Sequence, residues 1–166
     1  MDAAPLLIRV AKLMERHGLD AILIGNAAAA LQGAPLTTLD IDFLFRKTAP
    51  NMARLKALAR DLDAVILRPY YPVSGLYRLA RDEDGMQIDF MTVIDGIRSF
   101  EGLRKRARRI LLADTNLVVA DLSDIIKSKR AAGRPRDLAV LDVLERTRDE
   151  ASRLEKGQAE GSQGGE

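Results

Sequence analysis

Three aspartates lie inside apolar runs of the sequence, where a carboxylate needs a partner. Asp40 and Asp42 alternate with apolar residues in LDIDFLF, residues 39–45, and Asp89 has the same setting in MQIDFMTV, residues 86–93. Neighbouring carboxylates repel one another unless a cation lies between them, and Mg²⁺ prefers such oxygen ligands. Three carboxylates could hold two metal ions, which would activate a hydroxyl nucleophile and neutralise a leaving pyrophosphate. The alternative is that these acids only protect edge strands from aggregation.

The alternation of residue types over residues 38–46 predicts a strand. Successive side chains of a strand point to opposite faces of its sheet. We therefore expect Asp40 and Asp42 to share one face, and the apolar residues that alternate with them, Leu39 included, to face the core. If the strand that carries Asp89 pairs beside this one, all three carboxylates converge.

A second feature lies upstream, where Gly25 and Asn26 end an apolar run and precede an alanine-rich segment. This order predicts a junction from strand to helix. Such a junction exposes backbone N–H groups and the positive end of a helix dipole, which suit a triphosphate. Gly25 would permit close approach of the backbone to that ligand. The sequence lacks the phosphate loop GxxxxGK[ST], which argues against a P-loop NTPase.

Composition narrows the remaining chemistry. The 166 residues contain no cysteine and one histidine, His17, which precedes Gly18 at an expected helix end. Disulfides, thiolate metal sites and Cys-His catalysis are excluded, and His17 is interpreted as a helix-capping residue. No apolar run is long enough to span a membrane, and the N-terminus does not resemble a signal peptide. We therefore expect a cytoplasmic protein.

Basic residues gather in two stretches, although the net charge is only +2. The first stretch contains Arg98, Arg104, Lys105, Arg106, Arg108 and Arg109, and the second contains Lys127, Lys129, Arg130, Arg134 and Arg136. Such clusters suit phosphates or nucleic acid, or they are ordinary solvated helix faces.

Helices and strands are mixed along the chain. Periodicity, caps and breakers predict helices over residues 4–17, 26–34, 49–64, 98–109, 121–133 and 135–155. Alternation and turn residues predict strands over 21–25, 38–46 and 64–70, a hairpin over 75–95, and two short strands within 109–120. This order favours an α/β or α+β fold: a mixed β-sheet flanked by helices, with a C-terminal helical pair. We expect one domain, residues 1–155, and a disordered tail, residues 156–166, rich in Gly, Gln and Ser.

The motif order resembles the nucleotidyltransferase superfamily of the DNA polymerase β type. Its members carry a Gly-[Gly/Ser] pair before a helix, then Asp-x-Asp, then a single later Asp on a strand. The segment LSDIIKSKRAAGRPRDLAVLDVL, residues 122–144, is similar to one in small bacterial stand-alone nucleotidyltransferases, including the type found in toxin–antitoxin pairs. The resemblance spans about residues 20–146 and implies a nucleotidyltransferase-like sheet.

The resemblance also implies roles for individual residues. Magnesium ligands would be Asp40, Asp42 and Asp89, the last of which would also activate the incoming hydroxyl. The triphosphate would be held by Gly25 and Asn26, with Lys129 neutralising its charge. Lys129 is expected to be an exposed cation with no nearby acid, near the end of its helix. The alternative for its segment is an ordinary capped helix pair.

Three positions depart from the family pattern. Asn26 stands where Gly or Ser is usual, and its bulk would narrow the site. Many relatives have His-Gly near the end of the first helix and Arg after the Pro, where this chain has Gln32-Gly33 and Leu36. The missing Arg removes a substrate contact or a structural pair.

The implied activity is Mg-dependent transfer of a nucleoside monophosphate from an NTP to a hydroxyl or phosphate acceptor, on tRNA or on a protein. The implied setting is a toxin–antitoxin pair with an antitoxin partner. The alternative is a non-catalytic module of the same fold that binds nucleic acid or a partner protein through the basic clusters. Tyr70, Tyr71 and Tyr77 could stack on a base, or could pack in the core.

Overall fold

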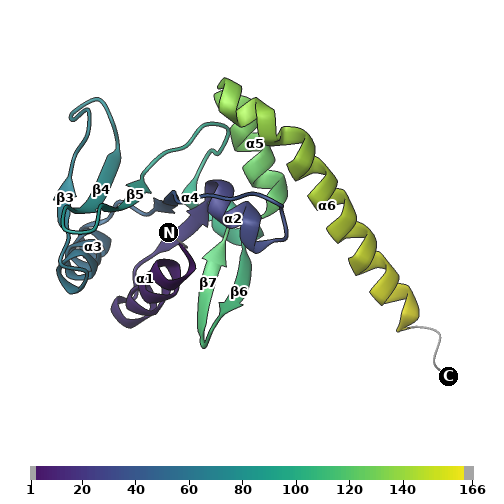
Figure 1. Ribbon diagram of the computed structural model, residues 1–166, viewed down its shortest axis with the longest axis horizontal. Coiled ribbons are helices and arrows are strands. Elements are labelled where there is room, and N and C mark those ends of the chain that lie inside the picture. The colour runs from purple at the N-terminus through teal and green to yellow at the C-terminus, as the bar shows by residue number, and fades with distance from the viewer. Residues whose placement is uncertain (1–2, 163–166) are drawn as a thin grey trace.

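The computed structural model describes residues 3–162, in which helices pack around a seven-stranded mixed sheet (Figure 1). The helices are α1 Ala4–His17, α2 Gly25–Leu31, α3 Ala49–Asp61, α4 Phe100–Arg106, α5 Leu122–Ala132 and α6 Pro135–Gly161. The strands are β1 Ala21–Ile24, β2 Ile41–Phe45, β3 Val65–Leu67, β4 Leu76–Arg81, β5 Met86–Met91, β6 Arg108–Leu112 and β7 Thr115–Val119. The predicted fold class, a mixed sheet with flanking helices and a C-terminal helical pair, is confirmed.

Both pairings of the central strand β2 matter for the site. The order across the sheet is β3-β4-β5-β2-β1-β7-β6. Strand β2 runs antiparallel to β1 and parallel to β5, which brings Asp42 opposite Asp89. The outer pairs β3–β4, β4–β5 and β6–β7 are antiparallel. The expected pairing between the two aspartate-bearing strands is therefore present.

Alternation along the strands separates a buried face of the sheet from a more open one. On β2, Phe43 and Phe45 are fully buried, and Phe43 stacks on Phe90 of β5 with ring centroids 5.0 Å apart. Phe45 meets Tyr77 of β4 edge to face at 5.4 Å. Such aromatic pairs add to the burial that holds these strands in register. Side chains such as Asp42 therefore point to the other face.

Helix ends follow the expected local signals. Gly18 adopts the left-handed conformation, with φ of 66°, and ends α1 as predicted. Asp121 caps α5, since its carboxylate accepts a hydrogen bond from the N–H of Ser123. Gly133, again left-handed, ends α5 and precedes Pro135 at the start of α6.

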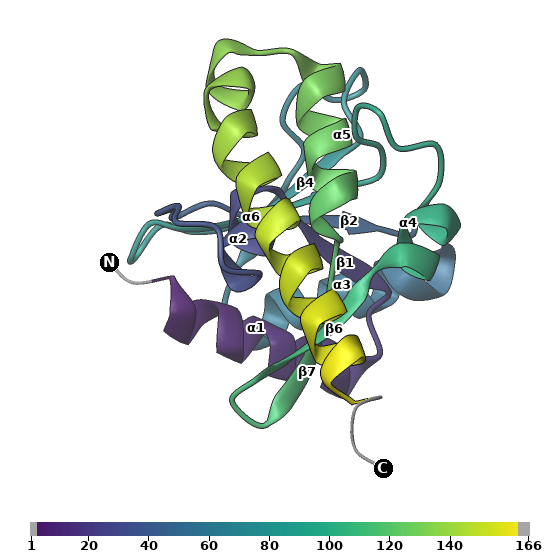
Figure 2. The same ribbon diagram turned by 90° about the vertical axis from the view of Figure 1, so that its right-hand side faces the viewer.

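Helices α5 and α6 form the predicted C-terminal pair, and α6 then runs on past β6 and β7 (Figure 2). The helix continues to Gly161, so residues 156–161 are helical rather than the disordered segment expected from composition. Glu, Lys, Gln and Ala in this stretch have good helix propensity and extend a helix that already exists. Residues 163–166 of the expected tail lie outside the described residues. No helix in the described part of the chain has the length and hydropathy needed to cross a membrane.

One buried amide ties the start of β1 to the end of β2. Asn51 of α3 has no exposed surface. Its Nδ2 donates to the carbonyl oxygens of Asp20 (3.0 Å) and Arg46 (2.6 Å), and its Oδ1 accepts from the N–H of Asp20 (2.8 Å). These bonds fix the base of the two strands whose opposite ends lie at the site.

We expect Asn51→Ala to lower the free energy of unfolding by about 3 kcal/mol, because it leaves buried backbone groups without partners. Urea denaturation would measure this change. Lys56→Ala, at an exposed position of the same helix, is the control and should change it by less than about 0.5 kcal/mol. Equal effects from the two substitutions would contradict this role for Asn51.

Candidate active site

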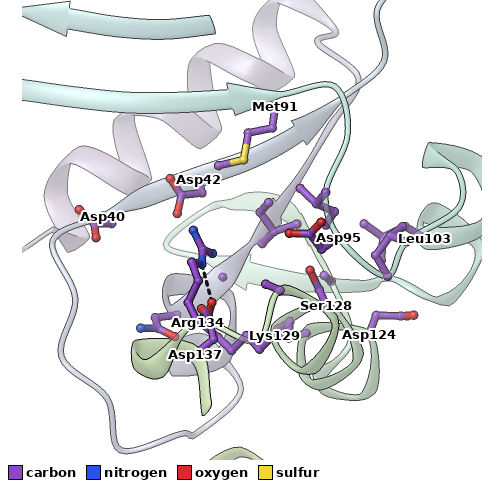
Figure 3. Close-up of a pocket in the computed structure, with 18 of the residues that line it drawn as sticks. Asp40, Asp42, Met91, Asp95, Leu103, Asp124, Ser128, Lys129, Arg134 and Asp137 are labelled. Atoms are coloured by element: carbon purple, nitrogen blue, oxygen red, sulfur yellow. Dashed lines mark hydrogen bonds and ion pairs between the residues drawn. The ribbon is translucent and has the colours of Figure 1, made fainter. Parts of the chain in front are cut away.

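A cavity of about 470 Å³ lies between the end of β1, the start of β2, the segment after β5, helix α5 and the start of α6 (Figure 3). Gly96, in the segment after β5, is in contact with α5. A Cβ atom at this position would lie 2.9 Å from Cβ of Ala131 and 3.0 Å from the carbonyl oxygen of Lys127, and its φ is 75°. Only glycine fits so close an approach, so Gly96 brings the wall of the cavity against the helix.

Asp42 enters this cavity from β2, and Asp40 enters it from the irregular segment just before that strand. Figure 3 shows Asp42 across the cavity from the Arg134–Asp137 pair, with Asp40 at the outer edge of the site. The expectation for Leu39 was wrong, because this side chain is 63% exposed rather than buried. The strand begins only at Ile41, so alternation does not apply to the irregular segment before it.

Gly25 and Asn26 line the same cavity at the start of α2. Gly25 is left-handed, with φ of 68°, and a Cβ here would lie 3.4 Å from Oδ2 of Asp42. The junction therefore lies directly beside the carboxylate. The side-chain oxygen of Asn26 is buried and has no hydrogen-bond partner among the described residues. An unpaired buried amide is destabilising, and a ligand in the cavity would supply its partner.

The surroundings of Asp42 destabilise its ionised form, and a bound cation would stabilise it. Burial, then the like charges of Asp89 and Asp40, raise the pKa of Asp42 from 3.8 to about 6. The positive charges of Lys129 and Arg136 oppose this rise without cancelling it. An anionic site with incomplete compensation is the electrostatic setting in which a divalent ion binds.

Asp89 lies beside Asp42 but is already paired. The guanidinium of Arg78 on β4 donates from Nε to Oδ1 at 2.8 Å and from Nη2 to Oδ2 at 3.1 Å. Such two-pronged pairs are strong and geometrically specific. The Asp89 side chain is 13% exposed. Arg78 was not identified from the sequence, although the predicted hairpin over residues 75–95 contains both Arg78 and Asp89; the register of this hairpin, which pairs the two residues, is the signal that could have found it.

The donor set fits magnesium in part. Asp40 and Asp42 supply free carboxylate oxygens, the ligands that Mg²⁺ prefers. Asp89 would join them only if Arg78 releases or shares its carboxylate, and no group of three metal-ligating side chains is poised together within residues 3–162. Two carboxylates completed by water and phosphate oxygens still make a usual magnesium site.

Lys129 lines the cavity from α5, but its surroundings differ from expectation. It was expected to be exposed and without a nearby acid. Its side chain is instead 13% exposed, and Nζ lies 3.6 Å from Oδ1 of Asp137 on α6. Burial lowers the pKa of Lys129, against the opposing attraction of Asp137. The acid was overlooked because α6 folds back on α5 and brings Asp137 against Lys129.

Arg134 and Arg136 add two more cations to the same wall. Arg134 donates from Nε to Oδ2 of Asp137 at 2.6 Å, so this buried carboxylate holds both Arg134 and Lys129. Both arginines belong to the second basic stretch of the sequence, where no signal distinguished them from their neighbours. The cavity thus has an acidic side on β2 and a basic side on α5 and α6.

Half of the first basic stretch, three of its six residues, is paired with acids within the fold. Arg104 lies 4.0 Å from Asp20, Arg106 pairs with Asp124 at 2.9 Å, and Arg108 pairs with both Asp121 and Glu155 at 2.7 and 3.0 Å. In the second stretch, Arg130 pairs with Glu145. An arginine that is already paired with a carboxylate attracts a phosphate less strongly. These ion pairs therefore argue against the interpretation of the two clusters as nucleic-acid surfaces.

Other residues noted in the sequence have structural roles. Gln32, in the place of the family's His, donates from Nε2 to the carbonyl oxygens of Ala28 and Ala120. His17 lies 2.6 Å from Asp61 in addition to ending its helix. Tyr77 is buried and packs in the core, whereas Tyr70 and Tyr71 are 82% and 67% exposed, so base stacking stays a prediction for these two.

No protein-family model and no curated protein matches the sequence. Solved structures match its fold. ANT(2'')-Ia, described as an antibiotic-resistance factor, has a TM-score of 0.60 and 14% identity over 98% of each chain. The lincosamide antibiotic adenylyltransferase LnuA, solved with lincomycin bound, has a TM-score of 0.61 and 14% identity over 84% of this chain and 94% of its own.

A candidate nucleotidyltransferase from Thermotoga maritima has a TM-score of 0.55 and 18% identity over 94% of this chain and 92% of its own. ANT(2'')-Ia has also been solved in complex with adenylyl-2''-tobramycin. At identities this low, the similarity shows that the fold is shared and nothing more specific. The chain has the fold of the nucleotidyltransferases, as the resemblance implied.

Proposed function

We propose that the protein is a Mg-dependent nucleotidyltransferase that moves a nucleoside monophosphate from an NTP to an acceptor hydroxyl. One observation carries the proposal: Asp40 and Asp42 line the same cavity as Lys129, Arg134 and Arg136, and Asp42 lies across it from Lys129 and Arg134 (Figure 3). Acidic oxygens on one side suit metal ions, and cations on the other suit a triphosphate. The adenylyl products and antibiotic substrates of the fold neighbours are consistent with this chemistry.

In the proposed reaction, an acceptor hydroxyl oxygen forms a bond to the α-phosphorus of the NTP. The bond from that phosphorus to the bridging oxygen breaks, pyrophosphate leaves, and the hydroxyl proton passes to the carboxylate of Asp89. Asp40 and Asp42 would hold magnesium, which supplies charge neutralisation for the leaving group and activation of the hydroxyl. Gly25 and Asn26 would bind the triphosphate, and Lys129 would neutralise its charge.

The acceptor class implied by the family resemblance is a tRNA or a protein, and an antitoxin would be the regulatory partner. The small-molecule acceptors of ANT(2'')-Ia and LnuA add a third class. A non-catalytic role is the second candidate, favoured by the ion pair that holds Asp89 on Arg78. That pair would neutralise the acid in a protein that no longer binds metal.

The experiment is incubation with magnesium and each NTP, labelled at either the α- or the γ-phosphate, together with total RNA, a protein extract or a small-molecule extract. We expect label from the α-phosphate alone to reach one acceptor fraction, with release of pyrophosphate, and Asp42→Asn to abolish both. If neither product forms and no NTP raises the melting temperature in the presence of magnesium, the non-catalytic role is correct.

A further inference from the structure

The third aspartate of the candidate site lies between two charges of opposite sign. Asp89 on β5 is the register partner of Asp42 on β2 and, on its other side, of Arg78 on β4. Register partners project from the same face of a sheet. The row of side chains across these three strands is therefore carboxylate, carboxylate, guanidinium, and the cation sits beside the aspartate that would complete a second metal site.

The hydrogen bonds from Arg78 reach both oxygens of Asp89, whose side chain is largely buried. A carboxylate can accept about four hydrogen bonds, so two acceptor positions remain, and one of them can receive the proton of an acceptor hydroxyl. A second divalent ion differs from a proton in this respect. It would bind at an oxygen that a guanidinium already contacts, and the two like charges would repel one another in a poorly solvated place.

The surroundings of Arg78 offer it no second acid on its own side of Asp89. Its neighbours on the same face are Leu67 on β3 and, along its own strand, Leu76 and Ala80. Within the part of the chain that the structure describes, its guanidinium forms hydrogen bonds with Asp89 alone. Release would leave a cation that is 30% exposed among apolar side chains, which is unfavourable. We therefore expect the pair to persist when the nucleotide binds.

We propose that Arg78 limits the site to one metal ion. That ion would be held by Asp40 and Asp42 with phosphate oxygens, while the guanidinium supplies at Asp89 the positive charge that a second ion would otherwise supply. Arg78 is a positioning residue, because it acts through Asp89. The inference rests on the proposed function, since it concerns the metal content of the same site, and it replaces the two ions that three carboxylates suggested.

The test counts manganese ions, which take the same oxygen ligands as magnesium. Equilibrium dialysis is carried out with each NTP analogue that carries a methylene bridge between the α- and β-phosphorus, and the manganese held by the protein is measured. We expect about one ion per wild-type chain and about two per Arg78→Gln chain, because this variant frees Asp89. Two ions in the wild-type protein, or one in folded Arg78→Gln, would overturn the proposal.

Matched variants separate this effect from a loss of positive charge elsewhere. Arg81→Gln removes an arginine of the same strand that binds Asp84 through the same two nitrogens, and it should leave the count at one. Arg78→Lys keeps the charge at Asp89 and should also leave it at one. Combining Arg78→Gln with Asp89→Asn should return the count from two to one, which would assign the second ion to Asp89.

Melting temperatures give a second measurement on the same variants. Arg78→Gln leaves the buried Asp89 carboxylate without its partner, so the metal-free variant should melt below the wild-type protein. Manganese with the analogue should raise the melting temperature more in Arg78→Gln than in the wild-type protein, because an additional ion binds the folded state. An equal rise in both proteins would contradict the proposal. If Arg78→Gln does not fold, the wild-type count decides.

The ion count and the transfer experiment can fail separately. One ion in the wild-type protein and two in Arg78→Gln, without transfer of label, would support the role of Arg78 in a protein that lacks the proposed activity. Transfer of label with two ions in the wild-type protein would leave the activity standing and show that Arg78 releases Asp89. Binding of no manganese by any of these proteins would overturn both this inference and the magnesium dependence of the proposed function.

Discussion

Replacing Asp42 by asparagine is expected to stabilise the metal-free protein while it abolishes nucleotidyl transfer. The ionised carboxylate is destabilising because burial and the charges of Asp89 and Asp40 raise its pKa to about 6. Asparagine has nearly the same shape and no charge. The gain at neutral pH is about 3 kcal/mol, from a pKa difference of roughly two units. For a chain of this size it corresponds to a rise in melting temperature of about 5–10 °C.

The pH dependence follows from the direction of that pKa shift. The folded protein binds the Asp42 proton more tightly than the unfolded chain, whose pKa is near 3.8. The stability that this group contributes is therefore present below about pH 4 and is lost as the pH rises through about 6. Thermal melts in EDTA between about pH 4 and pH 7 should show this decline in the wild-type protein and a smaller one in Asp42→Asn.

Magnesium with NTP should reverse the decline in the wild-type protein only, because a cation offsets the ionised carboxylate and binds the folded state. Transfer by Asp42→Asn should fall on the order of a thousandfold. Asp40→Asn is the comparison: Asp40 is exposed and is the smallest of the three causes that raise the pKa of Asp42, so the variant should lose transfer and gain much less stability than Asp42→Asn. Identical melting curves for Asp42→Asn and the wild type across this pH range would refute the electrostatic account of Asp42.

Lys129→Met is expected to slow transfer by about two orders of magnitude, the effect of losing a positioned group that stabilises charge. Its side chain lies in the cavity on the wall opposite Asp42, and methionine can fill the same volume. The substitution also removes one partner of Asp137, which is 5% exposed. Arg134 still pairs with Asp137, so we expect the free energy of unfolding to fall by only about 1 kcal/mol.

Single-turnover assays would measure the transfer rate of Lys129→Met, and calorimetric titration with a non-hydrolysable NTP would measure its affinity for the nucleotide. The NTP affinity should fall together with the rate, because the lysine would contact the triphosphate before and during transfer. Lys127→Met, two residues earlier at an exposed position, should change neither. If Lys127→Met and Lys129→Met have the same effect, Lys129 has a structural role alone.

Local sequence signals predicted most of the elements. Helix α1 begins and ends where the apolar spacing and Gly18 placed it, and the hairpin of β4 and β5 turns at Asp84-Gly85 as expected. These features depend on residues close together in the chain, so periodicity and turn chemistry suffice to locate them. The same holds for Asp42, whose orientation follows from the two-residue period of its strand.

What the sequence alone determined is thus the set of elements and the chemical types of the site residues, Asp40, Asp42, Gly25 and Asn26 among them. Only the tertiary structure decided which charges meet. The pairing of β4 with β5 brings Arg78 onto Asp89, and the return of α6 along α5 buries Lys129 against Asp137. The first contact depends on the register of a hairpin and the second on how α6 packs against α5, and no single residue carries a signal for either. The environment of each site charge therefore became visible only in the folded chain.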